Sequence, residues 1–499
     1  GFPAGNTLNI NTTFENQDYS IGADGTLFTL PGGNVKLAIG YEHQDLKFIN
    51  ANNFATTINK RHINSGYTEL YVPLVGAGNA MPGVEKLELT GAVRLDDYSD
   101  VGRTVNPKFG INWSPTNWLK LRGSYGTSFR APGLVDNDPN SQAGYLPNYF
   151  AGSVIDPSLC ATCASNPNIA IYQALGGAAG NLKPESSTSW SLGFEIAPPQ
   201  SGFNASVTYW NVNYTGQVSF PVYSVGAYQS INQGYYDSQI IFNPTYFPGK
   251  AANNPEAFFG PYPANPSNAA CAAVIGKAVT TQALFDNMIN CINSGGTPPV
   301  LGVGASPSDV VALTNGHRIN AGNTHGQGLD LSASYDWSSG ANSWHVGFIG
   351  SYTLKWVVSP ISTAPAIDQV NVLNNPLRFR GRADASWGRD VGPGNLTFAA
   401  YLNYSNAYTI PQALLPIGVS SNYTHINSYT TVDLALHYDF GDNAGSLLKG
   451  FSMTVSAQNV FNAKPPFVIN TSSSASIQFD PANASPIGRM ITVQIGKKF

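Results

Sequence analysis

The feature that most constrains the fold of this chain is an alternation of apolar and polar residues that returns in long segments along almost its whole length. Between residues 86 and 96, for example, Leu87 and Leu89 alternate with Lys86 and Glu88. The same alternation occurs in segments 119–130, 190–196, 329–337, 379–387 and 432–440. Because successive side chains of a β-strand point to opposite faces, each segment is predicted to be a strand with one apolar and one polar face.

Two properties of these segments favour a membrane barrel over a soluble sandwich. Many of them extend over about 10 or more residues, which suits a tilted crossing of a bilayer, whereas strands of globular sheets usually have about 5–6. Tryptophans also lie near the predicted strand ends, where an aromatic girdle would place them: Trp113, Trp118, Trp337, Trp344 and Trp387. The sequence therefore predicts an all-β fold, a transmembrane antiparallel β-barrel of the bacterial outer membrane.

The links between the segments alternate between long and short. Long links are expected near residues 11–22, 50–64, 97–102, 130–187, 218–316, 357–375, 407–427 and 463–484. Short links are expected near residues 31–33, 78–83, 115–117, 198–202, 338–342, 390–394 and 442–446. This asymmetry is typical of outer-membrane barrels, which have short periplasmic turns and longer extracellular loops, and it predicts about sixteen strands in this chain.

The end of the chain and its composition agree with this prediction. The last segment alternates through Ile491, Val493 and Ile495 to a terminal Phe499, which we interpret as an assembly signal for the machinery that inserts barrels into the outer membrane. Charged residues make up only 11% of the 499 residues, against about 25% in soluble proteins. The net charge of -4 gives no reason to expect a nucleic-acid partner. No apolar stretch approaches the roughly 20 residues of a membrane-spanning helix, so a helical membrane protein is excluded.

Several motifs resemble the barrel of TonB-dependent outer-membrane receptors. The most specific are Tyr125-Gly126-Thr127-Ser128-Phe129-Arg130-Ala131-Pro132 and Asn181-Leu182-Lys183-Pro184-Glu185. Weaker matches are Leu95 to Asp100, Asn106 to Gly110, Gln458 to Asn462 and the closing segment from Gly488-Arg489 to Phe499. The resemblance covers most of the chain in the right order.

The resemblance implies energy-coupled uptake of a nutrient ligand, such as a siderophore or a carbohydrate, driven by the TonB complex through a plug domain. Family barrels have about 22 strands around a plugged lumen, whereas no plug is found here. We therefore expect residues 1–499 to be the C-terminal barrel portion, lacking the plug and roughly six strands. The alternatives are a complete sixteen-stranded porin-like channel and an adhesin whose large loops are the functional part. The expected partners are outer-membrane lipid, the ligand and the TonB complex.

The four cysteines lie in the two longest links. Cys160 and Cys163 form a CxxC in the link 130–187, and Cys271 and Cys291 lie in the link 218–316. A CxxC can serve redox or zinc chemistry, but no second CxxC or spaced His pair completes a zinc site. In an oxidising compartment we expect two disulfides, and the most local of three possible pairings is Cys160–Cys163 with Cys271–Cys291. Segments 267–275 and 282–292 are predicted to be short helices, which the second bridge would join.

Two sets of side chains are candidates for ligand contact. Arg378, Arg380 and Arg382 form a basic stripe predicted to face the lumen, where they would attract an anionic solute, dock a plug, or be neutralised by acidic residues such as Asp384. Aromatic residues of the long links suit neutral polyhydroxylated ligands or aromatic chelators, and equally suit packing of the loops against each other. They are Tyr145, Tyr149, Phe150, Tyr235, Tyr236, Phe258, Phe259 and Tyr262.

Motifs for catalysis or cofactor binding are not found in the sequence. It contains no nucleophile elbow, P-loop, dinucleotide fingerprint or HExxH pair. The segment from Asp136 to Ser141 begins like a calcium loop, but Ser141 replaces the required Gly and Pro147 the required Glu. We therefore expect no enzymatic activity, no cofactor and no metal site.

Overall fold

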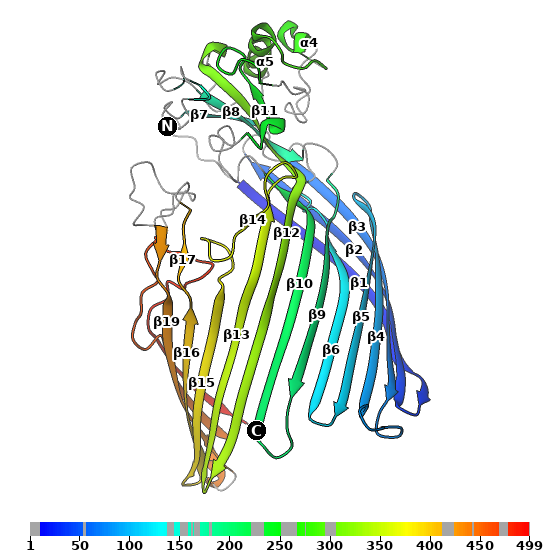
Figure 1. The fold of residues 1–499 in the computed structure, drawn as a ribbon, viewed down its shortest axis with the longest axis vertical. Helices are drawn as coiled ribbons and strands as arrows, with labels where there is room; N and C mark the ends of the chain where they lie inside the picture. Colours follow the sequence, from blue (N-terminus) through cyan, green and yellow to red (C-terminus); the bar gives the residue numbers. More distant parts are fainter. Residues whose placement is uncertain are drawn as a thin grey trace.

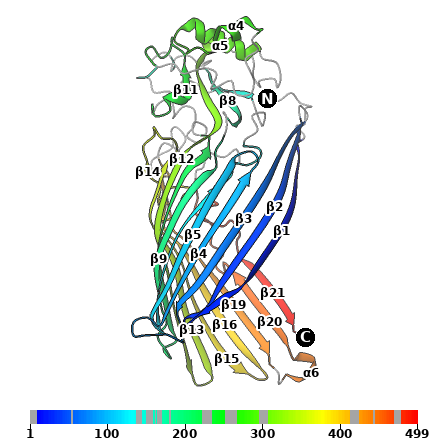
Figure 2. The same cartoon turned by 90° about the vertical axis from the view of Figure 1, so that its right-hand side faces the viewer.

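The computed structural model describes residues 10–52, 56–136, 144–149, 158–160, 163, 170–178, 182–220, 234–250, 267–274, 276–294, 306–411, 424–441, 444–468 and 478–498. These residues form a tall curved wall of strands with a smaller unit at one end (Figures 1 and 2). No helix in the described ranges is both long enough and apolar enough to cross a membrane.

The wall consists of fifteen strands among the residues described, against about sixteen predicted. They are β1 (Ile10–Leu30), β2 (Gly33–Asn52), β3 (Thr56–Val75), β4 (Lys86–Tyr98), β5 (Gly102–Thr116), β6 (Leu119–Arg130), β9 (Glu185–Ile196), β10 (Phe203–Ser219), β12 (Val310–Ser339), β13 (Asn342–Ser359), β15 (Phe379–Val391), β16 (Gly394–Ser405), β19 (Tyr429–Phe440), β20 (Phe451–Gln458) and β21 (Met490–Lys497). Each strand pairs antiparallel with the next in this order.

The two outermost strands of the wall are unpaired on one side. Within the described part of the chain, β1 pairs only with β2 and β21 only with β20. The wall is therefore a curved sheet with two edges rather than a hydrogen-bonded ring (Figure 2).

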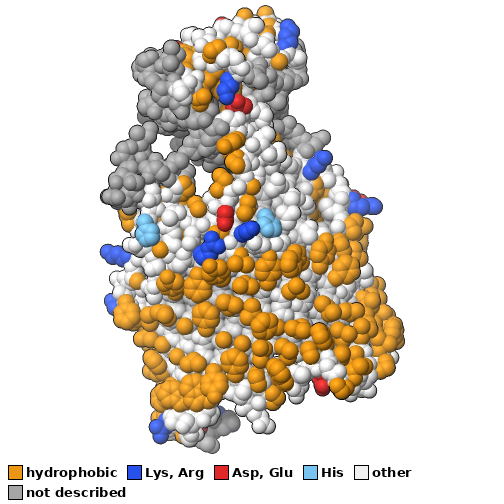
Figure 3. Space-filling model, viewed as in Figure 1, with side chains coloured by type: hydrophobic (Ala, Val, Ile, Leu, Met, Phe, Trp, Pro, Cys, Tyr) orange, Lys and Arg blue, Asp and Glu red, His pale blue; other side chains and the backbone are white. Residues whose placement is uncertain are grey.

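The outer face of the wall carries a broad apolar band, which Figure 3 shows in orange with few charged side chains inside it. Its residues are exposed although large, for example Leu89, Val93, Leu192, Phe194, Leu402 and Leu436. All of these except Leu402 belong to the predicted apolar faces. An exposed apolar belt of this extent matches the hydrocarbon layer of a bilayer. The alternation seen in the sequence is thus the alternation between lipid and lumen.

Aromatic rings mark the edge of the band near the short turns. Trp337 on β12, Trp344 on β13 and Trp387 on β15 follow one another across three adjacent strands, with ring centroids 6.0 and 6.4 Å apart. Tyr335 stacks on Trp337 at 5.3 Å. Indole rings at this height suit the boundary between hydrocarbon and headgroups, as the sequence predicted.

Three of the predicted long links are wrong. Residues 11–22 lie inside β1, which continues unbroken from Ile10 to Leu30. The link near 50–64 shrinks because β2 extends to Asn52 and β3 begins at Thr56, and the link near 97–102 is a tight turn between Tyr98 and Gly102. These segments are mostly polar on both faces and contain only scattered apolar residues, such as Phe14 and Ile21. For lack of a regular alternation, they were predicted from the sequence to be loops. Strands that continue beyond the bilayer need no apolar face, so their sequence there carries no period-two signal.

The smaller unit is built from the two longest links and lies at the end of the wall away from the short turns (Figure 1). We call it the loop subdomain. It contains β7 (Gly144–Tyr149), β8 (Ala170–Ala178), η3 (Asp237–Gln239), β11 (Ile240–Phe242), α4 (Ala269–Val274), α5 (Gln282–Ser294), η4 (Pro307–Asp309) and the first residues of β12. The helices α4 and α5 correspond to the two predicted helical segments. β8 pairs parallel with β12, and β7 and β11 pair antiparallel with β8 and β12.

The loop subdomain has an apolar core of its own. Val310 to Leu313 of β12 are fully buried between two clusters of apolar side chains. One cluster centres on Phe285, Met288 and Ile289 of α5 and the other on Tyr236, Ile240 and Phe242. Burying a large apolar side chain contributes roughly 1.5–3 kcal/mol, so these clusters hold the loops in a defined structure.

Short elements fill the remaining links. They are β14 (Ile367–Asp368), β17 (Tyr408–Thr409), β18 (His425–Ile426) and α6 (Gly445–Leu448). β17 pairs with β18, and the residues around them form a third apolar cluster with Leu373, Ile410 and Val468. This cluster fixes the links that border the lumen on the side of β15 to β21.

Candidate functional site

A cavity of about 780 Å³ lies against the inner face of β12, β13, β15, β16 and β19. Strand residues line one side, and residues 481–486 of the link between β20 and β21 line the other. Its polar strand residues include Asp330, Ser351, Arg380, Arg382, Asn403, Ser405, Tyr429 and Thr431. These residues come together because directly paired positions of neighbouring strands point to the same face.

Arg380 and Arg382 supply the positive charge of this cavity. Arg380 Nη2 donates a hydrogen bond to the Asn483 carbonyl oxygen at 3.1 Å, and its Nε lies 3.4 Å from the Ser405 hydroxyl oxygen. The Arg382 guanidinium lies over the Tyr401 ring, 4.2 Å from the centroid. Among the residues described, neither guanidinium has a carboxylate within ion-pair distance.

Asp384 does not neutralise the stripe, contrary to the alternative considered from the sequence. Its carboxylate oxygen lies 3.0 Å from Nε2 of His345, whose Nδ1 lies 2.7 Å from Asp336. The two acidic residues thus bracket one imidazole near the short turns. Arg380 and Arg382 therefore keep their charge for the cavity.

Arg378 does not belong with the other two arginines. It precedes β15, and its Nη1 donates to the carbonyl oxygens of Thr353 and Leu354 at 3.1 and 2.7 Å. Its guanidinium is therefore occupied by the end of β13. The basic stripe consists of two cavity residues and one residue that joins two strand ends.

The link that forms the far wall of the cavity is fixed by Asp480. This side chain is fully buried, and its oxygens accept hydrogen bonds from the Ala482 and Asn374 backbone N–H groups at 2.9 and 3.3 Å. The Asn483 amide donates to it at 2.9 Å. Burial together with the Asp480 charge raises the pKa of Tyr408 above its ordinary range. Asp480 therefore holds residues 481–486 over the arginines.

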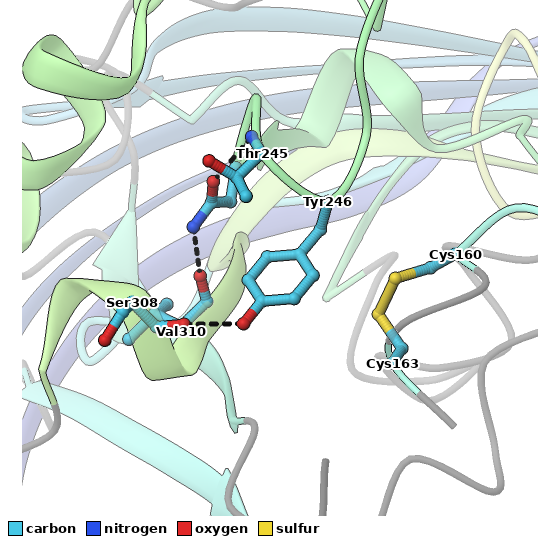
Figure 4. The surroundings of a disulfide bond; sticks show 7 residues. Cys160, Cys163, Thr245, Tyr246, Ser308 and Val310 are labelled. Atoms are coloured by element: carbon cyan, nitrogen blue, oxygen red, sulfur yellow. Dashed lines mark hydrogen bonds between the residues drawn. A yellow bond between two sulfur atoms is a disulfide. The ribbon is translucent and has the colours of Figure 1, made fainter. Parts of the chain in front are cut away.

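The structure pairs Cys160 with Cys163 and Cys271 with Cys291. The first bridge lies beside the contacts that join residues 243–246 to the start of β12 (Figure 4). There the Tyr246 hydroxyl donates to the Ser308 carbonyl oxygen at 2.7 Å, and the Asn243 amide donates to the Val310 carbonyl oxygen at 2.7 Å. The second bridge joins α4 to α5. Both bridges are buried and brace the loop subdomain.

The predicted aromatic ligand residues separate into different groups. Tyr236 is only 2% exposed and packs in the subdomain core, so it serves packing rather than ligand contact. Tyr235 is 44% exposed. Tyr145 and Tyr149 lie on β7. Phe150, Phe258, Phe259, Tyr262 and the terminal Phe499 lie outside the described residues.

The sequence did not single out the other residues of the cavity. Asp330 was predicted only as a member of a polar strand face, Asn403 and Thr431 lay outside the segments that were interpreted, and of residues 481–486 only 481–484 fell within a predicted long link. Ile349 also lines the cavity and is 56% exposed on the lumen face, where an apolar residue was not expected. The register between strands was the missing information, because it alone shows which polar residues are neighbours.

The wall, its lipid-facing band and its long-loop end define an outer-membrane β-barrel protein with a polar lumen. Residues 1–239 and 282–462 match the family model for the TonB dependent receptor-like β-barrel. The chain therefore belongs to the family of TonB-dependent receptor-like β-barrels of the outer membrane.

Solved siderophore receptors share the fold. A mutant of the ferric enterobactin receptor from Pseudomonas aeruginosa, in complex with enterobactin, is 13% identical, with a TM-score of 0.56 over 97% of this chain and 54% of that chain. The siderophore receptor PirA from Acinetobacter baumannii is 15% identical, with a TM-score of 0.54 over 98% of this chain and 55% of that chain. This chain thus spans about half the length of the receptors that it matches.

Proposed function

We propose that this chain is the C-terminal barrel portion of a TonB-dependent transporter that takes up an anionic nutrient ligand of the siderophore class. The observation that carries the proposal is the pair Arg380 and Arg382, which face a cavity of about 780 Å³ without a carboxylate partner among the described residues. A guanidinium group that has no carboxylate partner favours ligands with negatively charged oxygen atoms, because hydrogen bonds between charged groups are stronger than those between neutral groups. The siderophore receptors of similar fold support the ligand class.

The two edges of the wall support the assignment to a barrel portion. In hydrocarbon an unpaired strand edge costs several kcal/mol for each unsatisfied group, which favours a barrel in which additional strands pair with β1 and with β21. A family barrel of about 22 strands needs roughly six or seven beyond those seen here. We further propose that the plug domain, which would contact the TonB complex, belongs to the same part of the protein as these additional strands.

Uptake by cells tests the proposal. We would measure accumulation of radioactive iron from a panel of anionic ferric siderophores, with and without a functional TonB complex. The Arg380→Gln and Arg382→Gln variants should bind their ligand roughly ten times more weakly each, the loss of one charged hydrogen bond. Arg389→Gln, an exposed arginine outside the cavity, is the matched control and should bind normally.

Two results would contradict the proposal. Uptake that continues without the TonB complex, together with steady salt conductance of the purified protein in planar bilayers, would favour the porin-like channel. A second contradicting result would be an intact mass of 53.0 kDa for the protein isolated from its membrane, with Gly1 as its natural first residue. The protein would then contain neither a plug domain nor additional strands.

A further inference from the structure

The wall is interrupted between β5 and β6. The two strands are paired from Trp113 with Leu121 up to Lys108 with Gly126, and the pairing stops there. Above this level β5 continues to Gly102 with β4 as its only partner, and β6 continues to Arg130 with β9 as its only partner. In the described chain these strands therefore separate while each stays paired on its other side.

Pro107 gives the physical reason for the separation. A Cβ atom placed on Gly126 would lie 3.6 Å from the Pro107 carbonyl oxygen, so Pro107 presents its backbone to β6. A proline has no N–H group, so the next hydrogen bond of the ladder cannot form. The pairing ends one residue away, at Lys108.

Side chains of β4 and β3 contact β6 and the residues after it at the top of the gap. The rings of Tyr98 and Phe129 contact edge to face, with centroids 5.5 Å apart. Arg61 Nη2 donates to the Pro132 carbonyl oxygen at 2.8 Å. The gap is therefore a window in the wall, closed below by the β5–β6 ladder and above by these contacts. It holds a groove of about 560 Å³, lined by residues 101 and 103–106, 127–129 and 183–188.

The window crosses the upper edge of the apolar band. The ladder ends at Lys108 and Gly126, the next pair above the exposed rings of Phe109 and Tyr125. Above that level Leu95 pairs with Val105, and both are exposed on the outer face, at 37% and 55%. The next outward pair is Asp97 and Arg103, so the outer face changes there from apolar to charged. Arg103, in the upper part of the window, is therefore at the height of the lipid headgroups.

The exposed charged side chains that line the groove are cationic. Arg103 is 64% exposed and forms an ion pair at 3.8 Å with Asp97, a carboxylate that is itself 50% exposed. Asn320 bonds both the N–H and the carbonyl of Lys183 at 2.8 Å, while the Lys183 ammonium has no ion pair in the described chain. Glu185 is buried, and its charge is taken up by Tyr214, the Val218 N–H and Arg130.

We propose that the window between β5 and β6 is a binding site for the phosphorylated headgroup of an outer-leaflet glycolipid. Arg103 and Lys183 bind the phosphate oxygens, since each surface cation attracts anionic lipid. Val105 and Phe129 line the same groove and give it apolar surface, and the acyl chains descend along the exposed rings of Phe109 and Tyr125. The site lies on the outer wall, apart from the Arg380 and Arg382 cavity of the lumen.

The experiment uses the full-length receptor from its own outer membrane, stripped of lipid in detergent. It is placed in phosphatidylcholine nanodiscs with and without bisphosphorylated lipid A, and the lipid A retained on the released protein is measured by native mass spectrometry. The double variant R103Q/K183Q should show roughly twenty-five-fold weaker lipid A binding, about five-fold for each cation. The double variant R389Q/K449Q, which removes two exposed cations of the short-turn end, should retain lipid A like the wild type.

A second variant tests the window without removing charge. Pro107→Val restores the missing N–H, so the β5–β6 ladder should extend, amide exchange at residues 127–129 should slow, and lipid A retention should fall. Equal retention in R103Q/K183Q and wild type would overturn the proposal. The proposal would also be overturned if inorganic phosphate alone slowed amide exchange at residues 127–129 as strongly as lipid A does. The site would then bind a soluble anion rather than a lipid.

Discussion

Arg61 and Asp100 form an ion pair held by two hydrogen bonds. Arg61 Nε lies 2.8 Å from Oδ1 and Nη2 lies 2.6 Å from Oδ2 of the carboxylate. The Arg61 side chain is 6% exposed and that of Asp100 is 25% exposed. The Arg61 guanidinium also lies 5.4 Å from the centroid of the Tyr98 ring. One buried guanidinium therefore joins β3, the β4–β5 turn and the residues after β6.

Removal of this guanidinium should destabilise the upper wall. Arg61→Ala leaves the Asp100 carboxylate without its partner, at a cost of about 3 kcal/mol, and Arg61→Lys should cost less because the charge remains while the two-bonded geometry is lost. The measurement is the temperature at which the compact form of the purified protein disappears on a gel. Lys60→Ala, a neighbouring exposed site, is the control; equal melting of the Arg61→Ala and Lys60→Ala proteins would contradict the assignment.

The two disulfides should contribute unequally to the loop subdomain. Cys271 and Cys291 close a loop with a sequence separation of 20, and Cys160 and Cys163 one with a separation of 3. The chain-entropy model gives about 3 kcal/mol for the longer loop and about half of that for the shorter. The paired variant C271A/C291A should therefore expose residues 267–294 to limited proteolysis much more than C160A/C163A does. The barrel should stay intact in both, and proteolysis of the barrel strands in C271A/C291A would count against an independent core.

The loop subdomain should lose stability in mild acid because of His317. This side chain is 2% exposed, and burial lowers its pKa below the ordinary value of 6.5. Its Nδ1 lies 2.8 Å from Asn315 Oδ1, and the Asn315 amide nitrogen donates to Gln239, so the imidazole is held neutral as a donor.

The direction of the pH effect follows from proton uptake. The unfolded chain binds a proton at His317 more readily than the folded chain, so the stabilisation is complete above pH 6.5 and declines as the pH falls toward the lowered folded pKa. The melting temperature of the subdomain should drop between pH 7.5 and 5.5, the interval around the ordinary His value of about 6.5. His317→Gln should remove that part of the dependence, and an unchanged pH profile in this variant would refute the role of His317.

Neighbouring residues of β19 should respond oppositely to a charge. Leu436 faces lipid and is 45% exposed, whereas His437 faces the lumen and contacts Thr454 Oγ1 at 2.8 Å. Leu436 is level with Trp387, through its partner Phe398, at the edge of the apolar band. Leu436→Arg should therefore cost up to about 1 kcal/mol, the range for a cation near the interface, and His437→Arg should cost less. The folded fraction in lipid vesicles across a urea series measures both. A reversed order would mean that the two faces of β19 had been exchanged.

The membrane-spanning part of the fold was predictable from sequence because lipid and water impose opposite polarity on alternate residues. Segments such as 86–96 and 432–440 reveal β4 and β19 directly. Above the bilayer both faces of β1, β2 and β3 meet water, and the prediction of long links at 11–22 and 50–64 was wrong for that reason.

The candidate site was only partly predictable. The charges of Arg380 and Arg382 and their shared face followed from alternation, but their separation from Arg378 did not, since it depends on carbonyl groups at the end of β13. Sequence also could not show that Asp384 bonds His345 instead of an arginine. These facts depend on register, which is set by pairing between strands rather than by the composition of any one strand.

The parallel pairing of β8 with β12 has a consequence for how the chain folds. Most strands of the wall pair with the next strand in the sequence, to which a short link joins them. The entropy cost of closing the loop of each such hairpin is therefore small. Val310 pairs with Ala170, and this contact must wait until a long intervening chain has been gathered. Pairs of such high sequence separation form slowly. The subdomain is therefore expected to be the last part to fold, and an early encounter among its cysteines would be its characteristic misfolded state.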